Sequence, residues 1–137
     1  MTGGRPFLAS NFRVDLGDGK ARNLSAGFSE VIFPEFLTVP DSGGPAPVDA
    51  GNHLILKRGV CGSLDLYTWW DQTRLGLAPP RPKVTIQLMY QDLRKVALTW
   101  TFHQVRPVAL SYSPLRAQED EVFIETLVLA FDWFDLA

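Results

Sequence analysis

Hydrophobic and polar residues alternate with a period of two along several short segments of the chain, and this alternation is typical of half-buried β-strands. It first appears over residues 11–16, where Phe12, Val14 and Leu16 share one face and charged residues occupy the other. It returns at residues 28–33. Both segments are therefore predicted to be strands.

Turn-forming residues follow each of these two segments. An Asp-Gly pair at residues 18–19 is a hairpin signal, so the two strands are predicted to form a first hairpin. Four prolines and three glycines fall between residues 34 and 52, a density that excludes a helix and disfavours a central strand. We therefore expect a long loop over residues 34–52, which is either a contact arm or a disordered excursion.

One helix is predicted in the middle of the chain. A strand over residues 54–59 precedes it, and the helix itself is expected over residues 63–74, with Ser63 as its N-cap and Asp65 in its first turn. A proline-rich stretch ends it. The residues expected to dock the helix on the core share one face at spacings of three and four; they are Leu66, Trp69 and Trp70.

The second half of the chain is almost entirely strand-like. Alternating segments are found at residues 83–90, 96–105 and 121–131, with a polar hairpin loop at residues 91–95. The last segment is apolar on both faces, so it is either a central strand, a strand buried at an interface, or one that crosses a thick core. The fold is predicted to be mainly β, with two packed antiparallel sheets forming a barrel or sandwich flanked by one short α-helix.

Composition narrows the class of protein without giving its function. The 137 residues, 46% of them hydrophobic, suffice for one domain over residues 1–137, in which residues 1–9 form an extension that is either mobile or an interface arm. A net charge of −2 with scattered cations disfavours a dedicated nucleic-acid binder. The single cysteine, Cys61, excludes an intramolecular disulfide and fits a reducing compartment. Neither a signal peptide nor a membrane span is predicted.

The candidate chemical groups do not form a convergent site. His53 and His103 lack the spacing of a metal pair, and no local motif supports Cys61 with His103 as a nucleophile and base. The adjacent acids at 119–121 are interpreted as a solvated turn. The tryptophans at 69–70 either belong to the core or stack a sugar or base. A protein without catalytic residues, cofactor or metal is therefore predicted.

Five segments in a fixed order nevertheless resemble a known family. They are Gly27–Val31, Leu54–Gly59, Leu66–Trp70, Trp100–Val108 and Glu121–Leu129. Their order and spacing, over residues 10–131, resemble the tail-tube family of contractile phage tails and extracellular contractile injection systems. The chain is also similar, more distantly, to the ring-forming tube protein of type VI secretion.

This resemblance implies a structural subunit that assembles with itself into six-membered rings, which stack into a hollow inner tube driven by a contractile sheath. The implied partners are further copies of the chain, the sheath, baseplate hub or spike proteins, a tape-measure or cap protein, and cargo protein or DNA in the lumen. Direct membrane insertion is not implied. Assembly in the bacterial cytoplasm, in a particle that can be released, is expected. The alternatives are a tube-initiator or terminal tube protein at the baseplate and, more remotely, a monomeric β-barrel ligand-binding module.

The resemblance also assigns residues. Phe28 and Val31 match core positions, and Trp69 and Trp70 match aromatic helix positions. The candidates for contacts between subunits are Glu30, Asp49, Lys57, Arg58, Glu121 and Glu125. Residues 38–49 depart from the family, which commonly has a longer polar hairpin there, and this leaves open whether the chain is the repeating subunit or a specialised ring at the baseplate end.

Overall fold

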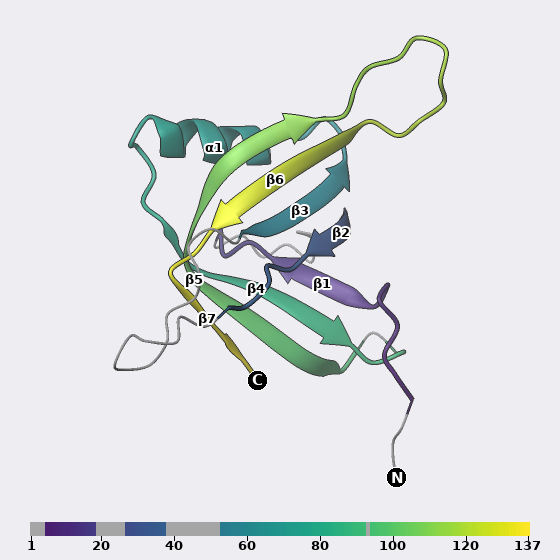
Figure 1. Ribbon diagram of the computed structural model, residues 1–137, viewed down its shortest axis with the longest axis vertical. Coiled ribbons are helices and arrows are strands. Elements are labelled where there is room, and N and C mark those ends of the chain that lie inside the picture. Colours follow the sequence, from purple (N-terminus) through teal and green to yellow (C-terminus); the bar gives the residue numbers. More distant parts are fainter. Residues whose placement is uncertain (1–4, 19–26, 38–52, 93) are drawn as a thin grey trace.

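The computed structural model describes residues 5–18, 27–37, 53–92 and 94–137. Within them the chain forms seven strands and one helix (Figure 1). In order, these elements are β1 (Phe12–Asp15), β2 (Phe28–Ile32), β3 (Leu54–Gly59), α1 (Asp65–Arg74), β4 (Arg81–Met89), β5 (Val96–Tyr112), β6 (Ile124–Ala130) and β7 (Trp133–Leu136). The prediction of a mainly β fold with one short helix is confirmed.

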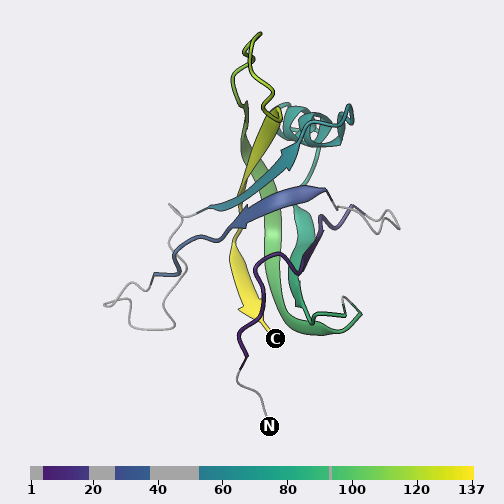
Figure 2. The ribbon, with the colours of Figure 1, turned by 90° about the vertical axis from the view of Figure 1, so that its right-hand side faces the viewer.

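Two antiparallel sheets share the long strand β5. One sheet contains β1, β4, β5 and β7, and the other contains β2, β3, β6 and β5. The strand path runs β1-β4-β5-β6-β3-β2, and among the described residues no ladder joins β1 to β2, so the sheet is not closed into a barrel. Figure 2 shows the two sheets crossing along β5, with α1 beside the upper one.

The transfer of β5 from one sheet to the other occurs at a bend. Gln104 adopts a φ of 56°, which is unusual for a residue other than glycine. Nη1 of Arg106 donates to the Gln104 carbonyl oxygen at 2.9 Å and to Oδ1 of Asp132 at 3.0 Å. The register then shifts between Pro107 and Ala109, and a proline is tolerated in the strand at such an irregularity.

The inward faces of both sheets and one face of α1 form a single core. Most of its members occupy every second strand position, as the sequence pattern predicts. They are Val14, Leu16, Phe28, Leu54, Leu56, Leu66, Trp69, Val84, Ile86, Phe102, Val105, Leu127, Leu129 and Phe131.

The predicted hairpin between the first two strands is wrong. β1 pairs with β4, with Val14 opposite Ile86, whereas β2 pairs with β3, with Val31 opposite Leu56. The Asp-Gly signal correctly indicates that the strand ends, but a turn signal does not determine which strand becomes the partner. That choice follows from burial of the apolar faces against distant strands.

The helix begins two residues later than predicted. Its N-cap position is Leu64, which makes no side-chain cap. Ser63 instead accepts a bond from the Asp65 backbone N–H at 3.3 Å and donates to the Asp65 carboxylate at 2.9 Å. Leu66 and Trp69 are buried, whereas Trp70 is half-buried beneath the Arg74 guanidinium, 5.4 Å from its ring centre.

The last predicted strand, over residues 121–131, is shorter in the structure and a further strand follows it. β6 lies centrally between β3 and β5, which selects the central-strand alternative among those left open by its apolar faces. β7, which the sequence pattern did not predict, pairs with β5, placing Phe134 opposite Phe102.

Candidate assembly surfaces

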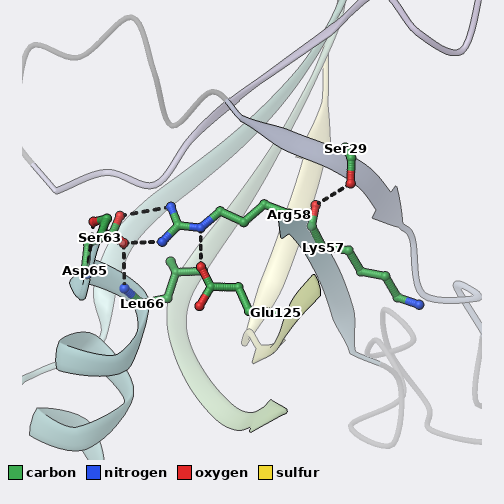
Figure 3. Close-up of polar contacts among 7 residues, drawn as sticks. All are labelled: Ser29, Lys57, Arg58, Ser63, Asp65, Leu66 and Glu125. Atoms are coloured by element: carbon green, nitrogen blue, oxygen red, sulfur yellow. Dashed lines mark hydrogen bonds and ion pairs between the residues drawn. The ribbon is translucent and has the colours of Figure 1, made fainter. Parts of the chain in front are cut away.

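A buried cluster of three charged side chains joins α1 to the sheet that contains β3 and β6 (Figure 3). Arg58 on β3 is 5% exposed and Glu125 on β6 is 3% exposed. Nε of Arg58 donates to Oε1 of Glu125 at 2.5 Å. The other end of the guanidinium reaches the carboxylate of Asp65, with Nη1 at 3.3 Å from Oδ2 and Nη2 bonded to Oδ1.

Both charges of the Arg58–Asp65 pair are stabilised by this arrangement. Burial alone raises the pKa of Asp65, but bonds from Arg58, the Ser63 hydroxyl and the Leu66 backbone N–H outweigh burial and lower this pKa from 3.8 to about 2. Burial lowers the pKa of Arg58, and its bonds to Asp65 and Glu125 more than reverse this, so that pKa is raised. Arg58 and Asp65 therefore stay ionised, and the bonds of the cluster hold the first turn of α1 against the sheet.

Two of the six candidate assembly residues are thus inside the subunit. Arg58 and Glu125 bond to each other there and present almost no surface to a neighbour. The sequence contains a signal for this placement. Arg58 continues the inward series of Leu54 and Leu56, and Glu125 shares its face with Leu127 and Leu129. A cation and an acid at inward positions of two strands predict an interior pair.

The other candidates lie elsewhere. Glu30 is exposed on the edge strand β2, opposite the half-buried Lys57 of β3. Glu121 is exposed in the loop between β5 and β6, where its Oε2 lies 3.5 Å from Nη1 of Arg116. Asp49 lies outside the described residues. Among the five candidates that lie in the described residues, the structure pairs Arg58 with Glu125 and Glu30 with Lys57.

Three strands, and residues 106–112 of β5, have a partner strand on one side only within the described ranges. β1 pairs with β4, β2 with β3 and β7 with β5. The outer edge of each strand presents backbone N–H and C=O groups that a strand of another molecule can pair with. The sheets therefore offer edges for extension between subunits.

The loop between β5 and β6 is a second exposed feature, and it contains the acids at 119–121 that the sequence indicates as a solvated turn. It extends away from both sheets in both views (Figures 1 and 2). It carries Leu115, which is 81% exposed, and Val122, which is 70% exposed. The loop therefore adds exposed apolar surface to a projecting part of the subunit.

The aromatic residues considered as a stacking platform are largely occupied. Trp69 is 4% exposed, and the Arg81 guanidinium lies 3.8 Å from its ring centre. A cavity of about 680 Å³ beside α1 is lined by Trp69, but this burial leaves no open indole face for a sugar or base. His103 stacks on Trp133 with ring centres 3.5 Å apart and bonds to Asp135.

The described ranges contain neither a cluster of metal-ligating side chains nor a membrane-spanning helix. No group of three or more histidine, cysteine, aspartate or glutamate side chains is arranged to hold a metal ion there. Among the same residues, no helix combines the length and apolarity needed to cross a membrane.

Comparison with known proteins gives the evolutionary context of this fold. The chain resembles a chain in the structure of the anti-feeding prophage tube-terminating cap, with 19% sequence identity, coverage of 100% of this chain and 94% of the other, and a TM-score of 0.77. It also resembles two chains of the PVC extracellular contractile injection system. One is in the extended sheath–tube complex, with 20% identity, coverage of 96% of this chain and 91% of the other, and a TM-score of 0.75. The other is in the extended sheath/tube terminator, with 20% identity, coverage of 99% of each chain, and a TM-score of 0.78.

These likenesses establish a shared fold, and the family follows from a direct match to the sequence. No curated protein matches the chain significantly. Residues 45–135 match the model of the T4-like virus tail tube protein gp19 family, and this range is more than half of the chain. The chain therefore belongs to the T4-like tail tube protein family.

Proposed function

We propose that this protein is a structural subunit of the inner tube of a contractile phage tail-like injection system. It assembles with itself into stacked hexameric rings that enclose a hollow conduit. The observation that carries the proposal is the match of residues 45–135 to the tail tube family. Sheath and baseplate proteins are its proposed partners, and a cargo protein or DNA is the proposed content of the lumen.

The surface of the subunit supports self-assembly. The outer edges of β1, β2 and β7 are available for pairing within the described part of the chain. A head-to-tail contact between unlike surfaces closes into a ring when the rotation between subunits permits it. Ring faces that differ from each other can then stack in one direction only, as a tube requires.

The test is negative-stain electron microscopy of the purified protein at rising concentration, with mass photometry to count subunits. Rings with six subunits and hollow stacks support the proposal. A protein that stays monomeric at high concentration, and also in the presence of its baseplate proteins, contradicts it. Spontaneous long tubes identify the main repeating subunit.

A second candidate function is that of a tube-initiator or terminal ring. The similarity to the prophage cap and to the PVC sheath/tube terminator, with TM-scores of 0.77 and 0.78, favours it. Such a protein forms single rings that do not grow into tubes. Ring assemblies that stay one layer thick over the full concentration range would select this candidate.

A further inference from the structure

The loop between β5 and β6 is an ordered projection. The aromatic rings of Tyr112 and Phe123 stack at its base, with centres 5.7 Å apart. The Ser113 backbone N–H donates to the Ile124 carbonyl at 2.9 Å, and the Ile124 N–H donates to the Ser113 hydroxyl at 2.9 Å. These contacts fix the direction in which residues 114–122 project.

The end of this projection, which we name the tip surface, is apolar and acidic. Its apolar group is Leu115, which is 81% exposed, whereas Val122 is exposed at the base of the loop, beside Gly59 of β3. Its charged residues are one cation, Arg116, and three acids, Glu119, Asp120 and Glu121. Nη1 of Arg116 lies 3.4 Å from Oε2 of Glu119 and 3.5 Å from Oε2 of Glu121. Since one cation faces three acids, the surface keeps a net negative charge.

A surface of opposite charge lies at the other end of the molecule. Residues 5–13 contact the turn after β4 at this end. The ring centres of Phe7 and Tyr90 are 5.1 Å apart, and the Met89 N–H donates to the Asn11 carbonyl oxygen at 2.7 Å. Both views place this region opposite the tip along the long axis (Figures 1 and 2). We name it the basal surface.

The basal surface combines exposed apolar groups with an excess of cations. Leu8 is 54% exposed and Tyr90 is 46% exposed. The charged residues are four cations and one acid, all exposed; they are Arg5, Arg13, Arg94, Lys95 and Asp92. The carboxylate of Asp92 accepts backbone bonds from Arg94 at 2.9 Å and Lys95 at 3.3 Å, which shapes the turn.

We propose that the tip surface of one copy docks on the basal surface of a second copy. The inference rests on the proposed self-assembly and specifies one of its contacts. A tip-to-tip contact would place two acidic surfaces against each other, whereas tip-to-base contact pairs opposite charges and covers Leu115 on one side and Leu8 and Tyr90 on the other. Since each copy carries both surfaces, the contact is head-to-tail and repeats from copy to copy.

The charge component is tested by reversal and rescue. Glu119→Lys with Glu121→Lys makes the tip basic, and we expect the contact to weaken by about tenfold at low salt. Adding Arg94→Glu and Lys95→Glu in the same chain restores opposite signs and is expected to restore assembly. Wild-type assembly should weaken between low and high salt, because exposed charge pairs are screened.

The apolar component has a matched control. Leu115→Ser should reduce assembly, whereas Leu77→Ser, which changes a leucine 67% exposed beyond the end of α1, should leave it unchanged. Circular dichroism and thermal melting of both variants separate loss of contact from loss of folding. Equal assembly of the two serine variants would overturn the role given to Leu115.

Crosslinking tests the geometry directly. In a Cys61→Ser background, Leu115→Cys combined with Tyr90→Cys should give an oxidised ladder of dimers, trimers and longer species, and neither single cysteine should do so. Dimers from Leu115→Cys alone would indicate tip-to-tip contact and overturn the inference. If every variant forms normal rings but the double-cysteine variant gives no crosslinked ladder, this contact is overturned and the proposed function stands. A wild-type chain that never assembles contradicts both the contact and the proposed function.

Discussion

Replacement of Arg58 by methionine should remove a large share of the stability of the fold. The change leaves the Glu125 carboxylate, 3% exposed, without the guanidinium that now bonds it at 2.5 Å. Removing one partner of a buried ion pair costs about 3–5 kcal/mol, because the remaining charge is buried without compensation. Asp65 loses its partner too, but its side chain is 21% exposed and can regain bonds with water.

Urea unfolding of the monomer, followed by tryptophan fluorescence, measures this loss. With an m-value of about 1–3 kcal/mol/M, Arg58→Met should lower the midpoint by about 1 M or more. Lys57→Met is the matched control on the same strand, since Lys57 is half-buried and outside the cluster, and it should change stability by less than about 1 kcal/mol.

The double variant Arg58→Met with Glu125→Leu distinguishes the cost of an unpaired buried charge from the loss of packing around the pair. Replacing both members of a buried pair by apolar groups is often close to neutral, so most of the lost stability should return. If Arg58→Met unfolds within about 1 kcal/mol of wild type, or if the double variant is no more stable than the single one, the burial argument fails.

Three other changes test separate features. Since the pKa of Asp65 falls from 3.8 to about 2 on folding, its ionisation should add about 2 kcal/mol of stability above pH 3.8. This is lost as the pH falls toward 2, and Asp65→Asn should abolish the loss in acid titrations. Gly17→Ala should cost well over about 1 kcal/mol in thermal melts, because φ is +65° and the new Cβ would lie 2.0 Å from the Lys83 carbonyl oxygen. Phe36→Ala removes a ring stacked 4.0 Å from Phe134 and should cost about 1 kcal/mol; an unchanged urea midpoint would show that this contact is energetically neutral.

Local pattern predicted individual elements well, because alternation records which face of a strand is buried. β3 and its inward Leu54 and Leu56 follow directly from the sequence. The pairing of the strands did not follow from the sequence, since it depends on residues far apart in the chain. β1 therefore appeared to belong to a hairpin although its partner, β4, lies more than sixty residues further on.

Register shifts, strand ends and buried charges could not be predicted from the sequence, because alternation, backbone geometry and burial compete at single positions. Strict alternation from Val84 through Ile86 and Leu88 would place Met89 on the opposite, polar face, but the register shift between Leu88 and Met89 buries its side chain. Alternation predicts a strand that ends at residue 105, whereas an irregular register at Pro107 lets β5 continue to Tyr112. Family resemblance and charge point to the candidate assembly residues, but neither criterion distinguishes a surface acid from the interior Glu125.

The sharing of β5 between the two sheets has a mechanical consequence. Its seventeen residues are one covalent backbone that begins in the sheet with β4 and ends at the projecting loop. A push applied to that loop therefore travels along peptide bonds into the opposite sheet, without crossing a boundary where two independently packed layers could shear. In the proposed tube, this continuity couples the two sheets of each copy through one backbone.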